Sequence, residues 1–131
     1  MKGSLKRSLW RAVLGFAVGA REKNFWRHII STAGTVTCAV YYKLSPLELA
    51  FVVFCCGCVI GAELLNTGIE RLADEHSNPR SSLDVSATGV LVISLFALAS
   101  GAILIVPKAA GDPLLLVIVI IAILIGWMVI P

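Results

Sequence analysis

Charged residues are scarce in this sequence. Asp, Glu, Lys and Arg together make up 15% of its 131 residues, whereas 58% are hydrophobic. A soluble domain of this length could not bury that much apolar surface, so the composition excludes an ordinary soluble protein and indicates an integral membrane protein. The formal net charge is only +3, and nothing in the charge pattern suggests a nucleic-acid partner.

The sequence also lacks the paired cysteines and histidines that hold a structural zinc ion. Its cysteines are Cys38, Cys55, Cys56 and Cys58, and no second pair follows at zinc-finger spacing. All lie in apolar segments, so we expect small buried hydrophobic residues. No internal repeat, low-complexity tract or cleavable signal peptide is evident either, and residues 1–131 are expected to form a single membrane domain.

Long apolar segments are what the sequence has in abundance. Each is close to the roughly 17–25 residues that cross a bilayer as a helix. Ahead of them, apolar and basic residues recur with a helical period, which is typical of a helix lying in the headgroup layer. We therefore expect an all-α integral membrane protein. Its predicted elements are an amphipathic surface helix at 4–21, transmembrane helices at 26–44, 46–74 and 84–107, and an additional fourth transmembrane helix at 113–130.

Basic residues are distributed unevenly along these segments. Seven of the eleven Lys and Arg residues lie before the first span or at its start, and Arg71 and Arg80 lie between the second and third spans. The opposite side has only Lys43 and Lys108. The positive-inside rule therefore predicts a cytoplasmic N-terminus and a cytoplasmic 71–84 connection.

The second span ends in four polar residues at helical spacing, Glu63, Asn66, Glu70 and Asp74. At about 100° per residue they fall within about 80° of one another around the helix axis, so they form one narrow stripe. Carboxylates are costly in or near hydrocarbon and usually have a function there. Two or three carboxylates joined by an amide on one face suit a divalent cation together with a general base.

The depth of Glu63 indicates what this stripe is for. It lies 17 residues beyond Pro46, which is roughly 26 Å along a helix. A hydrocarbon core is about 30 Å thick, so Glu63 is expected at its cytoplasmic edge. A stripe that runs from the lipid boundary into water suits a reaction between a water-soluble reagent and the head of a lipid. A transport site would lie nearer the bilayer midplane.

Residues 62–70 (Ala-Glu-Leu-Leu-Asn-Thr-Gly-Ile-Glu), with Asp74 one turn later, resemble the signature of the small prokaryotic diacylglycerol kinase family, which includes the undecaprenol kinases. Upstream, Glu22-Lys23-Asn24-Phe25 together with His28 resembles the second motif of that family, in the form found in the undecaprenol kinase branch. Asp84 matches a further acidic position of the family.

This resemblance covers roughly residues 5–106. It implies a homotrimer of three-span subunits in the bacterial inner membrane, with a surface helix and with active sites shared between subunits. It also implies that the γ-phosphate of ATP is transferred, with Mg²⁺, to the hydroxyl of a membrane lipid alcohol. The acceptor stays open between undecaprenol, diacylglycerol and another lipid alcohol, although Asn24 and His28 favour the polyprenol.

The same resemblance assigns roles to individual residues. Phosphoryl transfer needs a positioned metal ion and charge neutralisation more than covalent help, which agrees with an acidic site. The arginines of the surface helix are candidates for contact with an anionic ligand. The candidate residues are Glu63 as general base, Glu22 and Glu70 as Mg²⁺ ligands, and Asn24, Asn66, Asp74, Asp84, Arg7 and Arg11 as nucleotide- or substrate-binding residues.

The sequence departs from the family pattern in two places. The family usually has a lysine just before the acidic residue matched by Asp84, but this chain has Leu83 in a connection that is a few residues short. Arg80 is the nearest remaining cation, and we predict that it contacts the ATP phosphates. The second departure is the fourth apolar segment, which carries no ionisable residue between 114 and 130. No phosphate-binding Gly-rich loop is present, so helix faces and the 75–84 connection would have to bind ATP.

Two other functions remain open at this point. A small four-span transporter built around a membrane carboxylate would fit the length and the number of spans. A catalytically silent relative that binds lipid or nucleotide without turnover would fit Leu83. ATP consumption that depends strictly on added lipid separates these alternatives from a lipid kinase.

Overall fold

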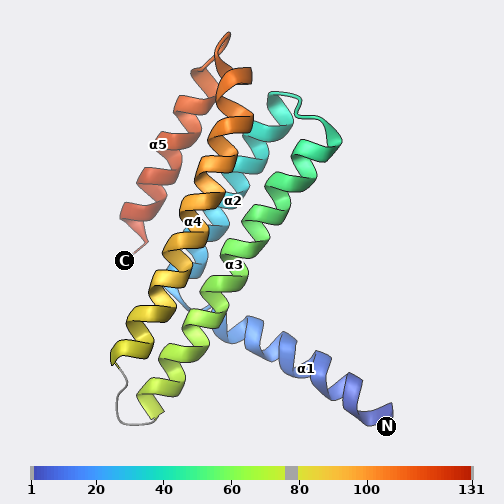
Figure 1. Cartoon of the computed structure of the whole chain (residues 1–131), viewed down its shortest axis with the longest axis vertical. Helices are drawn as coiled ribbons and strands as arrows, with labels where there is room; N and C mark the ends of the chain where they lie inside the picture. Colours follow the sequence, from blue (N-terminus) through green and yellow to red (C-terminus); the bar gives the residue numbers. More distant parts are fainter. Residues whose placement is uncertain (1, 76–79, 131) are drawn as a thin grey trace.

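The computed structural model describes residues 2–75 and 80–130, with side chains for residues 5–75 and 82–130. Every regular element in this part of the chain is a helix, which confirms the predicted all-α class (Figure 1). The helices are α1 (Lys2–Gly19), α2 (Lys23–Tyr41), α3 (Pro46–Glu75), α4 (Arg80–Ala109) and α5 (Leu114–Val129).

Two of these helices are long and apolar enough to cross a membrane. They are α3, with 30 residues, and the Ser82–Ala109 part of α4, with 28 residues. A 30-residue helix is about 45 Å long, so α3 is long enough to pass the hydrocarbon and extend into water. Helix α5 is apolar but has only 16 residues. The crossing of the membrane by α2 and α5 therefore stays a prediction.

The ends of α4 differ from the prediction. The helix begins at Arg80 and not at Asp84, so Ser82 and Asp84 lie in its first turns and do not cap it. It also continues through Pro107 to Ala109. Proline lacks an N–H group and weakens a helix interior, but here only the last turn follows it. Helix α3 ends at Glu75 and α4 begins at Arg80, so the first turns of α4 occupy part of the expected 75–84 connection.

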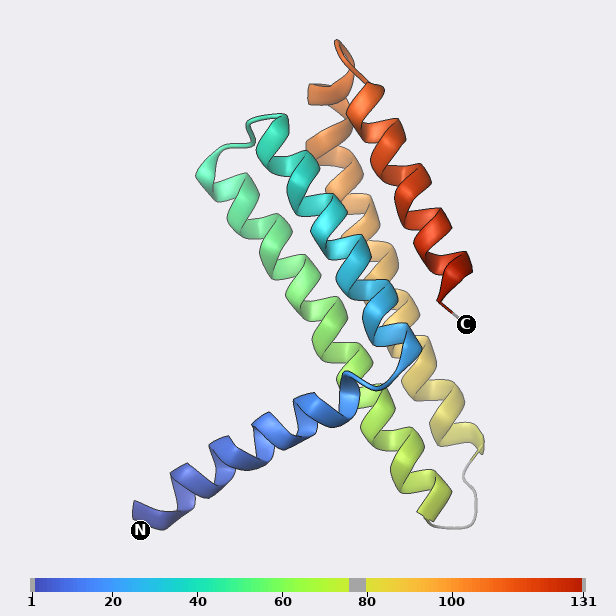
Figure 2. The same ribbon diagram turned by 180° about the vertical axis from the view of Figure 1, so that it is seen from behind.

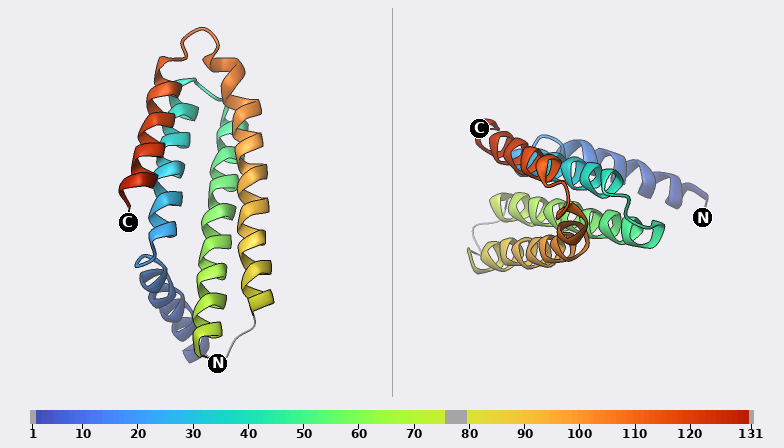
Figure 3. Two further views of the ribbon diagram at one scale, coloured as in Figure 1. Left: turned by 90° about the vertical axis from the view of Figure 1, so that its left-hand side faces the viewer. Right: turned by 90° about the horizontal axis from the view of Figure 1, so that it is seen from above.

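Helix α2 occupies the middle of the bundle. It packs against α3 on one side and α5 on the other, while α4 packs along α3 (Figure 3). Close approach between α2 and α5 depends on Gly34, because a Cβ atom there would lie 2.8 Å from Cγ1 of Val119. Helix α5, which lies outside the segment that resembles the family, thus packs into the bundle against α2.

Helix α1 leaves the bundle and diverges from α3 toward its N-terminus (Figures 1 and 2). Its apolar side chains Leu5, Leu9, Val13 and Phe16 are all exposed, and they recur every three to four residues along the helix. Its last turn touches the bundle, where a Cβ atom at Gly19 would overlap the Leu64 side chain of α3. That the exposed face lies on a membrane surface remains a prediction.

The end of the bundle opposite α1 contains the buried core. Cys38 and Ala39 of α2 pack there with Leu44, Val52 of α3 and Ile105 of α4. Cys38 is thus a small buried residue, as predicted, whereas Cys55, Cys56 and Cys58 are only partly buried. Because these residues come from three helices and the connection between α2 and α3, they fix the spacing of α2, α3 and α4 at this end.

Polar links tie the same end together. The Lys108 ammonium of α4 lies 2.9 Å from the Glu48 carboxylate of α3. Two adjacent tyrosine hydroxyls donate to Asp112 in the last connection, Tyr41 to Oδ2 at 3.0 Å and Tyr42 to the main-chain oxygen at 2.8 Å. The connection between α4 and α5 is therefore hydrogen-bonded to the end of α2 and to the connection between α2 and α3.

Candidate active site

The polar stripe of α3 runs from a buried to an exposed environment. Glu63 and Asn66 are only 4% and 5% exposed, whereas Glu70 and Asp74 are exposed. Burial of a carboxylate or an amide is costly unless it finds polar partners. The partners of Glu63 and Asn66 therefore define the site.

Asn66 joins α3 to α4 and to the next turn of its own helix. Its Nδ2 donates to Oε1 of Glu70 at 2.8 Å. The Ser86 hydroxyl of α4 donates to Asn66 Oδ1 at 2.7 Å, with the Leu83 carbonyl oxygen 3.0 Å away as a second acceptor. Because the amide is both donor and acceptor, its orientation is fixed and it holds the Glu70 carboxylate in place.

Glu63 faces α2 and the turn that precedes it. Its Oε2 lies 3.8 Å from Nε2 of His28. The Asn24 side chain is within reach as a hydrogen-bonding partner, and the carboxylates of Glu22 and Glu70 are close enough to interact electrostatically with Glu63. Three residues that lie 35 to 41 positions before Glu63 in the sequence thus come close to one buried carboxylate.

Glu22 reaches this region because the α1–α2 turn packs against α3. The close contact between Gly19 and Leu64 places the turn beside the stripe. Arg71, the residue after Glu70, then donates from Nη2 to Oε1 of Glu22 at 2.8 Å. The contact lies within one chain, and it gives Glu22 a cationic partner.

The three carboxylates of Glu22, Glu63 and Glu70 do not form a preassembled metal cage. Among the described residues, no three His, Cys, Asp or Glu side chains are grouped so that they could hold a metal ion together. Magnesium, however, usually keeps several waters and binds through one or two carboxylates plus substrate phosphates. The exposed Glu70 carboxylate, held by Asn66 through one oxygen, fits that type of site.

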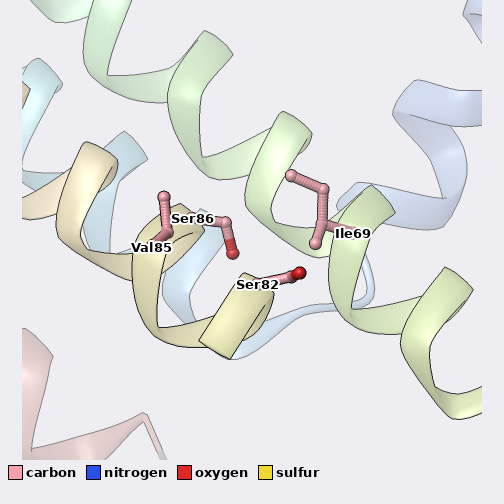
Figure 4. Close-up of a pocket in the computed structure, with 4 residues that line it drawn as sticks. All are labelled: Ile69, Ser82, Val85 and Ser86. Carbon is pink, nitrogen blue, oxygen red and sulfur yellow. The ribbon is translucent and has the colours of Figure 1, made fainter. Parts of the chain in front are cut away.

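A shallow hollow opens between α3 and α4 beside this network (Figure 4). It is lined by Ile69 of α3 and by Ser82, Val85 and Ser86 of α4. Ser86 belongs both to the hollow and to the Asn66 network. A molecule bound in the hollow would therefore lie next to Ser86, which is hydrogen-bonded to the Asn66 amide that holds Glu70.

The remaining predicted residues lie on α1 and α4. Asp84 is exposed on α4, and no hydrogen bond or ion pair joins its carboxylate to α3 in the described residues. Arg7 and Arg11 are exposed on the diverging α1. Arg80 begins α4, but the phosphate contact predicted for its side chain falls outside the side chains that the structure describes.

Two residues that contact the site, Arg71 and Ser86, are not among the candidates predicted from the sequence, in which Arg71 indicates only topology and Ser86 carries no signal. A third, His28, is predicted only as a member of the second motif. Each of them acts through a residue on another helix or turn, on Glu22, Asn66 and Glu63 respectively. The proximity of Arg71 to the motif over 62–70 was the one usable sign.

Two long apolar helices and a row of carboxylates along α3, from buried to exposed surroundings, are compatible with a membrane-bound enzyme. The family model of prokaryotic diacylglycerol kinase matches residues 11–105, which is most of the chain. The chain therefore belongs to the prokaryotic diacylglycerol kinase family, a family of membrane lipid kinases, and the predicted resemblance is confirmed. No curated protein and no solved structure matches the chain.

Proposed function

We propose that this protein transfers the γ-phosphate of ATP to the hydroxyl of a membrane lipid alcohol at the cytoplasmic face of the bacterial inner membrane. The observation that carries the proposal is the position of Glu63. It is a buried carboxylate at the end of an apolar helix stretch, with Glu22 and Glu70 in electrostatic range. A lipid hydroxyl held at the boundary can reach Glu63, while a nucleotide can approach the exposed Glu70 from water.

In this proposal Glu63 is the general base. It accepts the proton of the lipid hydroxyl while the hydroxyl oxygen forms a bond to the γ-phosphorus. The bond between that phosphorus and the β–γ bridging oxygen breaks, and ADP leaves with the electron pair. A general base positioned in this way typically contributes about 10²- to 10⁴-fold in rate.

The other residues bind and orient the nucleotide. Glu70 and Glu22 would hold Mg²⁺, and Asp74 and Asp84 would line the phosphate side of the site. When bound with the nucleotide, Mg²⁺ neutralises charge on the phosphates. Asn66 keeps the Glu70 carboxylate turned toward this region through its 2.8 Å hydrogen bond. The hollow between α3 and α4 lies beside the same amide, so it is a candidate location for part of a substrate.

The assembly that we propose is a homotrimer, on the basis of the family. In a shared site, Glu22 of one subunit would act with the α3 stripe of another. In this chain Glu22 already contacts Arg71 of its own α3. Mixing inactive Glu22→Gln and Glu70→Gln subunits decides between the two arrangements: partial recovery in verified mixed trimers supports a shared site, whereas no recovery supports a site within one chain.

The test of the function is transfer of the γ-phosphate from labelled ATP to lipid by the purified protein in detergent. Undecaprenol and diacylglycerol are offered separately, and lipid-free micelles serve as the blank. We expect transfer that requires added lipid and Mg²⁺ and that falls by about 10²-fold or more in Glu63→Gln. Glu75→Gln is the matched control, because Glu75 is exposed at the end of the same helix. Wild-type protein that binds ATP but transfers no phosphate to either lipid would make it a silent relative.

A further inference from the structure

Helix α5 lies beyond the segment that matches the family model, which ends at residue 105. After the connection that contains Asp112, it runs back along α2 toward the site end of the bundle (Figure 3). Its last turn and the capping residue Ile130 that follows it contact two neighbouring residues of α2, His28 and Arg27 respectively. Both are themselves in contact with the surroundings of Glu63.

The first of these contacts is aromatic. The Trp127 ring lies edge to face with the His28 ring, with centroids 6.1 Å apart and planes at 84°. Its indole Nε1 also donates to Oγ of Ser31 at 3.1 Å, one turn further along α2. On its other side His28 places Nε2 3.8 Å from the Glu63 carboxylate. Trp127 thus limits the positions that the His28 ring can take beside Glu63.

The second contact is polar and uses the end of the chain's last helix. Nη2 of Arg27 donates to the main-chain oxygen of Ile130 at 3.0 Å, and Nη1 of Arg27 donates to Oδ1 of Asn24 at 2.9 Å. Because Oδ1 of Asn24 is occupied as an acceptor, its amide nitrogen is left to act as a donor. The Asn24 side chain also lies close enough to the Glu63 carboxylate to influence it. The planar fork of a guanidinium suits such a bridge, which an ammonium cannot reproduce.

Close packing holds α5 in this register. Besides the contact at Gly34, a Cβ atom at Gly126 would lie 3.4 Å from the Ile30 side chain. Gly126 directly precedes Trp127 in the same turn, so the small residue brings the helix end close to α2. Two different interactions, one aromatic and one a pair of hydrogen bonds, therefore connect the same end of the chain to the surroundings of Glu63 through separate residues.

We propose that the last turn of α5 is a positioning element of the kinase site, which sets His28 through Trp127 and Asn24 through Arg27 so that Glu63 is held ready for the lipid hydroxyl. The inference rests on the proposed function, because it names what the fourth helix does for that reaction. A misplacement of about 1 Å at a reacting group can cost about 100-fold in rate. His28 and Asn24 lie beside Glu63, so a shift of α5 that displaces them should lower the rate.

The test compares kcat and KM in the lipid phosphorylation assay. Trp127→Ala should lower kcat by about 10- to 100-fold and leave the KM for ATP unchanged, because no α5 residue is assigned to nucleotide. Trp127→Phe keeps an aromatic ring against His28 and should retain most of the activity. Met128→Ala is the matched control, since Met128 is in the same turn but is 86% exposed. Equal kcat values for Trp127→Ala and Met128→Ala overturn the inference and leave the proposed function standing.

A double-mutant cycle separates positioning from a general loss of stability. If Trp127 acts through His28, then Trp127→Ala should have no further effect on kcat in a His28→Ala background. Additive losses would mean that Trp127 only stabilises the fold, and they overturn the inference. Arg27→Lys provides the second arm if Trp127→Ala does not fold, and it should lower kcat at unchanged KM for ATP because Lys cannot bridge Asn24 and Ile130.

One measurement does not depend on activity. The sequence has two histidines, so a His76→Ala background leaves His28 as the single imidazole signal in an NMR spectrum. Trp127→Ala should shift that signal, whereas Met128→Ala should not. An unmoved signal overturns the inference. A wild-type protein without lipid-dependent transfer overturns the proposed function, and the catalytic part of this inference falls with it.

Discussion

Replacing Asn66 with alanine tests whether the amide organises the metal side of the site. Asn66 is almost fully buried and is bonded on both sides, to Glu70 through Nδ2 and to Ser86 through Oδ1. Alanine removes both bonds and places no new charge or bulk in the helix. Glu70 then keeps its position in the sequence but loses the group that orients its carboxylate.

The size of the effect follows from these two bonds. A hydrogen bond to a charged group contributes about 1.5–3 kcal/mol, and a bond between neutral groups about 0.5–1.5 kcal/mol. The first value belongs at its lower end because Glu70 is exposed, and solvent screens such interactions. The second is partly recovered because Ser86 keeps the Leu83 carbonyl as an acceptor. We therefore expect a loss of about 2 kcal/mol in the free energy of unfolding.

The effect on catalysis should be seen in the Mg²⁺ dependence. Groups that orient a metal ligand typically change metal affinity by about 10- to 100-fold when they are removed. The Mg²⁺ concentration for half-maximal transfer should therefore rise by that factor in Asn66→Ala, at saturating ATP and lipid. Ser86→Ala is the comparison: it leaves the Asn66–Glu70 bond in place and should shift the Mg²⁺ dependence much less.

Two results would refute this reasoning. The first is an Asn66→Ala protein that melts at a lower temperature but has the wild-type Mg²⁺ dependence, because Asn66 would then be structural only. The second is an equal shift in Asn66→Ala and Ser86→Ala, because the orientation of Glu70 would then not depend on its direct bond to Asn66.

Three further predictions concern single positions. Glu70→Gln should abolish transfer while the protein still migrates as a folded oligomer, whereas Glu75→Gln should remain active; retention of more than a few per cent of turnover in the former would remove Glu70 from the site. Arg80→Ala should raise the KM for ATP by roughly ten- to a hundred-fold, the value of a lost charged hydrogen bond, without changing the KM for lipid; an unchanged KM for ATP would assign the phosphate contact to another cation. Gly34→Ile should lower the melting temperature more than Gly57→Ile, because an added Cβ meets Val119 at 2.8 Å in the first case and nothing within 4 Å in the second; equal melting temperatures would contradict the close packing of α5.

Much of the fold follows from features that lie within one segment. The α3 stripe is an example, since a period of 3.6 residues places Glu63, Glu70 and Asp74 on one face whatever surrounds the helix. The same holds for the gradient from buried Glu63 to exposed Asp74, which follows from distance along an apolar helix. Prolines and polar clusters located the helices to within a few residues. The predicted boundary was least accurate at the start of α4, where Ser82 and Asp84 lie within the helix although both residue types are good caps.

The partners of the site residues could not be predicted because they depend on how helices pack. The bond between Ser86 and Asn66 spans 20 positions, that between Arg71 and Glu22 spans 49, and that between Arg27 and the Ile130 carbonyl spans 103. A single helix pattern indicates which face is polar, but not which helix covers it or at what height. The second motif could be predicted because it was identified by resemblance to a family. A motif shared by a family groups residues that helix packing brings to one site, so it indicates partners that a single helix pattern does not.

The contacts between α3 and α4 differ in kind at the two ends of the bundle. At the end that carries Asp112, a buried core and the ion pair between Lys108 and Glu48 join the two helices. At the other end, the hydrogen bond between them in the described part of the chain is that from Ser86 to Asn66. Ser86 also lines the hollow between the same helices. A ligand that fills the hollow would therefore compete with Asn66 for the Ser86 hydroxyl, while the core and the ion pair at the far end keep the register of the two helices.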